Sequence, residues 1–305
     1  MAHEGGVVSR NEFIVALVNG LSYGFLLFLI AAGLSLVFGV LGVLNFAHGG
    51  FFMVGAFIGL QIGGAAALSP WVFFLVVLAA GLVMAAIGAV AEVGIFRHMY
   101  HRAHFDFLLL TFALSLVAEG AVREIWGATP LAMAFPEGWG RAFDVFGATV
   151  PQYSVFVIIV GLLILGGLSL LLLKTQIGKL IRTVAEDRWM AEALGINVRL
   201  VFTAVFALGI FLAGAAGVMV APTQALTAQL GALFLIQAFA VVIVGGLDSV
   251  PGALVAALIL GLLQSFLVVT FNQLAPYSLY IGIIVVLLVR PQGLLGSREL
   301  LRRVS

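Results

Sequence analysis

Nine apolar segments constrain this chain more than any other feature of its sequence. A helix needs about 20 apolar residues to cross the hydrocarbon core of a bilayer, and these segments reach or approach that length. They cover residues 13–40, 49–67, 71–95, 105–125, 152–173, 200–221, 232–247, 252–270 and 274–289. The first is long enough to contain a break, whereas 232–247 and 274–289 are short enough to be re-entrant. We therefore predict an all-α, polytopic membrane helix bundle of eight to ten spans, with broken or re-entrant helices, in a single transmembrane domain, 1–305.

The composition agrees with a membrane bundle and narrows the chemistry. Hydrophobic residues make up 63% of the 305 positions and charged residues 9%, against about 25% charged in soluble domains. The chain has no cysteine, which excludes disulfides, thiolate metal sites and thiol catalysis. Its net charge of +1 indicates no nucleic-acid partner. No basic region or cleavage site precedes Phe13, so we expect the first apolar segment to be retained.

Basic residues predict the orientation, because Lys and Arg accumulate on the cytoplasmic side of a membrane. Eleven of the fourteen fall into three stretches separated by even numbers of crossings: Arg97 and Arg102; Lys174, Lys179, Arg182, Arg188 and Arg199; Arg290, Arg298, Arg302 and Arg303. The connection 126–151, which is rich in proline and tryptophan, is then the main external loop. This pattern predicts a cytoplasmic C-terminus and an external N-terminus, the latter on the evidence of Arg10 alone.

The most polar interior stretch, 174–199, lies between two apolar segments. Thr183 and Glu186 have the spacing of a capping box, helix-forming residues follow, and Gly195 supplies a left-handed stop. We predict an exposed helix of about three turns here, with Asn197 placed to cap the next span. From this stretch alone, an ordinary solvated loop is an equally good interpretation.

Polar residues also interrupt the apolar segments at two places that are related by a weak internal repeat. Five residues within 42–61 recur 203 positions later within 245–264, and each copy holds a polar interruption beside glycines: Asn45 with His48, and Asp248. Paired interruptions of this kind indicate a midplane site built from broken helices, where unpaired backbone groups can meet a polar solute. The competing interpretation is that these side chains cap the broken helices and touch no solute.

Enzyme signatures are absent. Gly178-Lys179 lacks the first glycine of a phosphate-binding loop, and no His-Glu-x-x-His motif or serine nucleophile elbow occurs. We predict neither a catalytic residue nor a metal site. The pairs Glu92 with Arg97 and Glu119 with Arg123 are interpreted as local ion pairs near the membrane boundaries. Three histidines interleaved with arginines are interpreted as an interface cluster that holds a loop at lipid headgroups: His98, His101 and His104.

Four strings together carry a resemblance to a known family. They are Asn45-Phe46-Ala47-His48-Gly49; Ala185-Glu186-Asp187 followed by Leu194-Gly195-Ile196-Asn197; Gly245 to Gly252; and Arg290 to Gly296. In this order, they closely resemble the LivH-type permease of bacterial branched-chain amino acid ABC importers, over about 19–296. The third string departs from the family pattern, because Asp248 stands where glycine is usual.

The resemblance implies a role for each group of residues. By this resemblance, the residues expected to couple the chain to an ATPase subunit are Thr183, Ala185, Glu186, Asp187, Leu194, Gly195, Ile196 and Asn197. The two interruptions, read with the resemblance, give a predicted substrate pathway of Asn45, His48, Gly49, Asp248, Ser249 and Gly252. The second break carries a carboxylate, that of Asp248. Two interpretations of this residue stay open: it alters solute preference, or it caps a helix.

The resemblance also implies partners and a location. The chain would pair with a second, LivM-like permease, two cytoplasmic ATPase subunits and a periplasmic solute-binding protein in the bacterial inner membrane. It would hold no cofactor, because ATP and Mg would be bound by the partner ATPases. Similar importers carry urea, short amides or aromatic acids, so these solutes stay as alternatives. A stand-alone channel or ion-coupled secondary transporter is an alternative of another class, although ion coupling would favour more buried ionisable residues.

Overall fold

The structure, a computed structural model, describes residues 9–145 and 147–296, and nearly all of its regular structure is helical. The helices are α1 (Arg10–Leu41), α2 (Ala47–Gly63), α3 (Pro70–Gly94), α4 (His104–Trp126), α5 (Gln152–Lys174), α6 (Gln176–Glu186), α7 (Arg188–Ala193), α8 (Val198–Val220), α9 (Leu230–Gly245), α10 (Val250–Thr270) and α11 (Ser278–Val289). Short 3-10 turns, η1 (Phe96–Met99) and η2 (Ala275–Tyr277), precede α4 and α11. The predicted helical bundle is confirmed, and every apolar segment forms a helix.

Six helices in the described residues are long and apolar enough to cross a membrane, namely α1, α3, α4, α5, α8 and α10. The other apolar helices are shorter, with 17 residues in α2, 16 in α9 and 12 in α11. At about 1.5 Å per residue, none of the three reaches the roughly 30 Å of a hydrocarbon core. The predicted range of eight to ten spans is therefore higher than the number of helices that qualify by length and composition.

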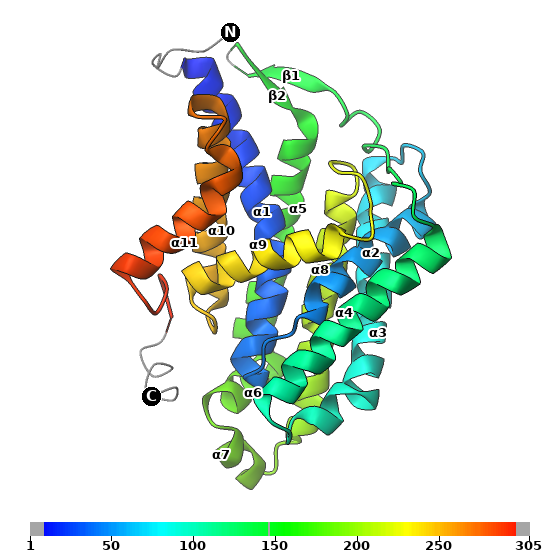
Figure 1. Cartoon of the computed structure of the whole chain (residues 1–305), viewed down its shortest axis with the longest axis vertical. Coiled ribbons are helices and arrows are strands. Elements are labelled where there is room, and N and C mark those ends of the chain that lie inside the picture. Colours follow the sequence, from blue (N-terminus) through cyan, green and yellow to red (C-terminus); the bar gives the residue numbers. More distant parts are fainter. Residues whose placement is uncertain (1–8, 146, 297–305) are drawn as a thin grey trace.

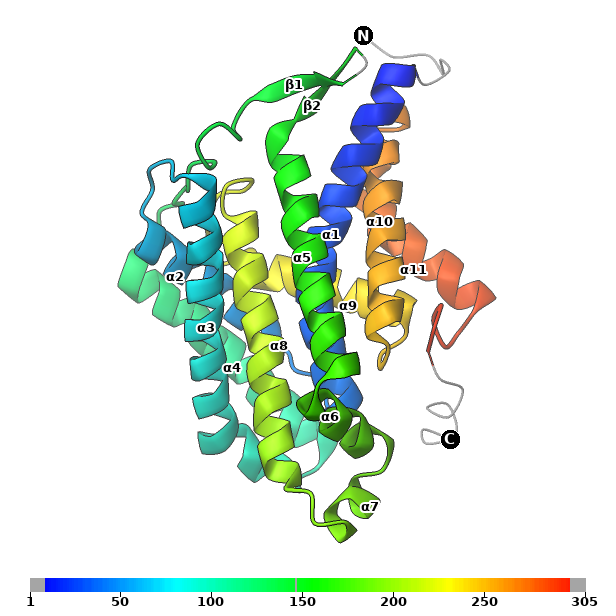
Figure 2. The same cartoon turned by 180° about the vertical axis from the view of Figure 1, so that it is seen from behind.

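The helices form two layers that differ in direction. In the upright layer, α1, α3, α5, α8 and α10 run along the long axis of the molecule (Figures 1 and 2). In the oblique layer, α9 crosses the upright helices and α2, α4 and α11 run at a slant beside it (Figure 1). Within the upright layer α1 is central, with 78% of its most apolar stretch buried.

Glycines set the close packing between these helices. A Cβ atom on Gly33 of α1 would collide with the carbonyl oxygen of Gly209 in α8, and one on Gly55 of α2 would collide with Gly214. Gly217 lies equally close to the backbone of α2. Small residues of this kind let transmembrane helices approach until their backbones touch. These contacts give the glycines of α8 a role in helix packing.

The weak sequence repeat corresponds to a structural one. α1 runs unbroken for 32 residues to a left-handed Gly42, with φ of 71°, and α2 begins at Ala47. α9 likewise ends at a glycine of positive φ, Gly246 with φ of 108°, before α10 begins at Val250. The starts of α2 and α10 thus keep the offset of the repeat. The two units pack crosswise, because α1 contacts α10 while α2 contacts α9.

The two ends of the molecule carry different connections. A β-hairpin of β1 (Ala142–Val145) and β2 (Ala148–Pro151) lies within 126–151, beside the start of α1, and was not expected from the sequence. α6 and α7 lie at the opposite end (Figure 1). The loops predicted to be external and cytoplasmic are therefore at opposite ends. Which side each end faces stays a prediction, and three of its arginines lie outside the described residues: Arg298, Arg302 and Arg303.

Candidate functional site

The polar stretch 174–199 contains two short helices where one was expected. α6 has 11 residues and begins after Thr175, whose hydroxyl accepts a hydrogen bond from the N–H of Gly178 at 3.1 Å. α7 has six residues and begins after Asp187, whose carboxylate accepts one from the N–H of Met190 at 2.9 Å. Both caps satisfy N–H groups that the first turn of a helix leaves open.

The capping box predicted at Thr183 and Glu186 is wrong, because both residues lie inside α6. The Thr183 hydroxyl donates instead to the carbonyl of Lys179, at 3.0 Å. The helix begins earlier than predicted since its apolar side, with Ile181 and Val184, is buried against the bundle. Tertiary burial of an amphipathic side stabilises a helix more than a local cap does.

The predicted end of this unit is confirmed. Gly195 follows α7 with φ of 81°, in the left-handed region that favours glycine. Asn197 caps α8 by accepting a hydrogen bond from the N–H of Leu200 at 3.2 Å. The chain therefore turns sharply after α7 and re-enters the bundle with its first N–H groups satisfied.

α7 extends beyond the rest of the bundle (Figure 1). It presents apolar side chains to its surroundings. Trp189 is 75% exposed, and Met190 and Leu194 are also exposed. Exposed apolar groups beside charged ones are typical of a protein-docking surface. The base of α7 is tied to α8, because the guanidinium of Arg188 lies 5.0 Å from the centre of the Phe202 ring.

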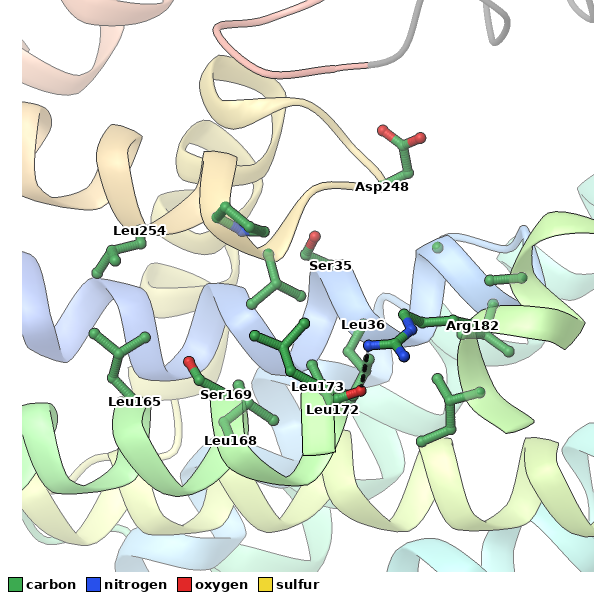
Figure 3. A pocket seen from close by; sticks show the side chains of 16 residues that line it. Ser35, Leu36, Leu165, Leu168, Ser169, Leu172, Leu173, Arg182, Asp248 and Leu254 are labelled. Carbon is green, nitrogen blue, oxygen red and sulfur yellow. Dashed lines mark hydrogen bonds between the residues drawn. The ribbon is translucent and has the colours of Figure 1, made fainter. Parts of the chain in front are cut away.

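A cavity of about 420 Å³ lies between α1, α5, α6 and α10 (Figure 3). Six of its sixteen lining residues are leucines from α1, α5 and α10, and its polar side chains are Ser35, Ser169, Arg182 and Asp248. Arg182 donates to the carbonyl of Leu172 at the end of α5, at 2.7 Å. In Figure 3 the Asp248 carboxylate points away from the leucine-lined wall.

This cavity brings together residues that the sequence assigned to two different roles. Ala185, from the predicted coupling set, and Asp248, from the predicted pathway, both line it. The second break is held against α1, since the Ser35 hydroxyl donates to the carbonyl of Leu247 at 3.3 Å. The end of α6 and the second break therefore face the same cavity.

The other pathway residues of the second break shape the chain. Ser249 caps α10 by accepting a hydrogen bond from the N–H of Gly252 at 3.0 Å. A Cβ atom on Gly252 would collide with the carbonyl oxygen of Gly245, so the two ends of this break pass in backbone contact. Gly49 plays a similar part at the crossing of α2 with α9, where it lies against Gly231.

The first break holds two fully buried polar side chains. The side-chain Oδ1 of Asn45 accepts a hydrogen bond from the N–H of Ala47 at 3.0 Å, and Nε2 of His48 donates to the carbonyl of Ile30 at 3.0 Å. Within the described chain, Nδ2 of Asn45 and Nδ1 of His48 have no hydrogen-bond partner. The geometry agrees with the capping interpretation of Asn45, and contact with a solute stays a prediction for both residues.

Both predicted ion pairs are confirmed, and one belongs to a larger network that the sequence did not indicate. Arg97 reaches the buried carboxylate of Glu92 at 2.9 Å, and the hydroxyl of Thr203 donates to the same carboxylate at 2.6 Å. Thr203 comes from α8, so the network joins α8 to the end of α3. Nothing in the local sequence links Thr203 to Glu92. The second pair, Glu119 with Arg123, joins neighbouring turns of α4.

A second cavity, of about 210 Å³, lies between α2, α4 and α9 in the oblique layer. Glu119 and Ser115 of α4 line it, together with apolar side chains of all three helices. The sequence signal for this site was the acidic residue inside an apolar segment, which we interpreted only as a local ion pair. In the described residues, no group of three or more His, Asp or Glu is arranged to hold a metal ion.

Comparison with known proteins gives relatives that match the chain over most of its length. It is 29% identical to the high-affinity branched-chain amino acid transport system permease protein BraD of Pseudomonas aeruginosa, over 94% of this chain and 97% of that protein. It is also 29% identical to the LivH permease protein of Escherichia coli K12, over 94% and 96% of the two chains. The LivM permease protein of the same organism is 26% identical, over 96% of this chain and 77% of that protein.

The profile of one protein family, described as branched-chain amino acid transport system / permease component, matches residues 16–289. This range begins in α1 and ends with α11, so it includes both breaks and all six candidate spans. The chain is a multi-pass membrane protein that belongs to the family of branched-chain amino acid transport system permease components.

Proposed function

We propose that this chain is the membrane permease of an ABC importer for branched-chain amino acids. The observation that carries the proposal is the family match over residues 16–289, which covers both helix breaks. Its relatives are named as permease proteins of transport systems, which supports a role in transport rather than in catalysis. The chain would bind and release a solute and break no bond.

We further propose that α6 and α7 form the docking site of a cytoplasmic ATPase subunit. The support is the exposed apolar surface of α7, with Trp189 and Leu194, beside the basic residues of 174–199. These basic residues favour the cytoplasmic side of a bacterial inner membrane. ATP and Mg would then be bound by two partner ATPases, and a periplasmic binding protein would deliver solute at the hairpin end.

The proposed coupling runs from α7 into the bundle. α7 contacts α8 through Arg188 and Phe202, and α6 lines the cavity that contains Asp248. A shift of the docked ATPase would therefore move the start of α8 and the second break together. We propose that the pathway uses both breaks, with Asp248 lining a cavity while Asn45, His48, Gly49, Ser249 and Gly252 hold the helix ends in place.

A second permease is the expected partner within the membrane. This chain resembles both LivH and LivM of one organism, and LivH and LivM are each named as a permease of the same kind of system. Two related permeases, each with a broken-helix unit, would enclose a pathway between them. This arrangement accounts for the oblique layer, whose short helices lack the length to serve as separate spans.

The test is to express the chain with its neighbouring genes, purify it by a tag and measure ATP hydrolysis in proteoliposomes. We expect two ATPases and a second permease to copurify, and leucine-loaded binding protein to stimulate hydrolysis. The same partners with a response to urea, short amides or aromatic acids instead would reject the proposed solute and keep the importer. A chain that purifies alone and passes solute without ATP would reject the importer.

The docking proposal makes a sharper prediction. Replacing Trp189 with alanine should lower ATPase copurification about tenfold, since a large exposed aromatic group is typical of a binding hot spot. Trp71, which is 74% exposed at the opposite end of the bundle, provides the matched control. Trp71→Ala should leave copurification unchanged. Equal losses of copurified ATPase in the two variants would contradict docking at α7, because removal of any exposed tryptophan would then have the same effect.

A further inference from the structure

α4 is poorly suited to face lipid along its whole length. Among the six candidate spans it has the lowest mean hydropathy, and only 17% of its most apolar stretch is buried. Glu119 lies seven residues before the end of α4, roughly 10 Å along the helix, with its side chain 29% exposed. Ionisable side chains at such depth face protein or water, because exposure to hydrocarbon is costly.

The cavity beside Glu119 has a matching chemistry. It lies between α2, α4 and α9, which are neighbours in the oblique layer (Figure 1). Phe46 and Met53 line it from α2 and the preceding turn, and Phe239 lines it from α9. Among its described lining residues only Ser115 and Glu119 have polar side chains. An apolar enclosure with one carboxylate fits an apolar molecule that carries one cationic group.

Glycine packing places the cavity where three helices meet. A Cβ atom on Gly50 of α2 would lie 3.2 Å from Cβ of Ala118 in α4. Gly231, in the first turn of α9, lies against Gly49 on the other side of α2. The first turn of α9 therefore lines the cavity, and no side chain caps it. The positive end of the α9 helix dipole would favour the carboxylate of an amino acid, as a contact secondary to that of Glu119.

We propose that Glu119 binds the ammonium group of the amino acid as it crosses the membrane, and that a second permease packs against α4 to close this cavity. The inference rests on the proposed function and assigns it a solute-binding residue. Arg123 holds the Glu119 carboxylate in the absence of solute. The ammonium group of the solute becomes an additional donor to this carboxylate, which can accept several hydrogen bonds.

The test compares two acidic residues of α4 in the complete transporter, reconstituted with its ATPases, second permease and binding protein. Glu119→Gln should lower leucine uptake roughly tenfold, the loss expected for a hydrogen bond to a charged group. Subunit copurification and ATP hydrolysis stimulated by the binding protein should be unchanged. Glu124→Gln is the control, since Glu124 is exposed on the same helix and does not line the cavity. Glu119→Asp should restore part of the uptake.

The outcomes separate this inference from the proposed function. Wild-type uptake in Glu119→Gln, or equal losses in the two glutamine variants, would overturn the role of Glu119 and leave the importer standing. A wild-type complex that takes up no branched-chain amino acid would overturn both. Loss of assembly in Glu119→Gln together with no rescue in Glu119→Asp would assign Glu119 a structural role and overturn the inference.

A cross-linking experiment tests the second half of the proposal. The chain has no cysteine, so a single cysteine can be introduced without background. A cysteine at Val117, which is 65% exposed on α4, should cross-link to the second permease. A cysteine at Leu163, which is 59% exposed on α5 in the upright layer, should not. Cross-linking from Leu163 and none from Val117 would place the second permease on the other face and overturn the proposed closure.

Discussion

The upright and oblique layers are both built from apolar helices, but these helices differ in length and in what they do. The upright helices are long, and the central pair, α1 and α8, meet through glycines at backbone contact. The oblique layer contains three helices too short to span, and its one long helix carries a half-exposed glutamate. We infer that the upright layer provides the frame of the bundle and that the oblique layer holds the solute-binding residue proposed above, Glu119.

The sharpest test of this comparison is to add bulk to one glycine in each layer. Gly33→Val should destabilise the protein by about 3 kcal/mol, because its side chain would meet the carbonyl oxygen of Gly209 and force α1 from α8. Gly120→Val in α4 should be nearly neutral, since a Cβ atom there meets nothing within 4 Å. Thermal unfolding in detergent measures both. Similar melting temperatures for the two variants would mean that the layers do not differ in packing.

The two glutamates offer a second comparison. Glu92→Gln should destabilise the protein by about 2 kcal/mol, because it removes a fully buried negative charge. That charge pairs with Arg97 and accepts a hydrogen bond from Thr203. Glu119→Gln should change stability by less than about 0.5 kcal/mol, as is usual for an exposed pair. Chemical unfolding of the purified chain measures both values. A larger stability loss for Glu119→Gln would make it a structural residue and weaken its proposed role in transport.

The smallest predicted effect concerns the caps at the coupling end. Asp187→Ala should destabilise α7 by about 1 kcal/mol, which corresponds to roughly fivefold faster hydrogen exchange in that helix. Thr183→Ala should leave the exchange of α7 unchanged, because the Thr183 hydroxyl donates within α6 and caps nothing. Faster exchange in Thr183→Ala than in Asp187→Ala would restore the capping box that the structure contradicts.

Sequence patterns predicted the helices well because membrane spans depend on local composition. All nine apolar segments form helices. Gly195 ends the short helical unit and Asn197 caps the next span, as glycine geometry and amide capping predict. The starts of α2 and α10 also keep the offset of the weak repeat. The capping box at Thr183 failed since its spacing is common and a longer amphipathic helix, buried on one side, prevailed.

The sequence by itself determined that this chain is a helical membrane protein with two interrupted units, because apolar runs and glycine breaks act locally. Only the tertiary structure decided which polar residues share a cavity. Asp248 lines a cavity together with residues of α6, whereas Asn45 and His48 are buried between helices. From the sequence, Glu119 is interpreted as part of a surface ion pair. The structure shows that it also lines a cavity with residues of α2 and α9. The physical reason is that a helix direction depends on backbone contacts between glycines distant in sequence, which no local pattern encodes.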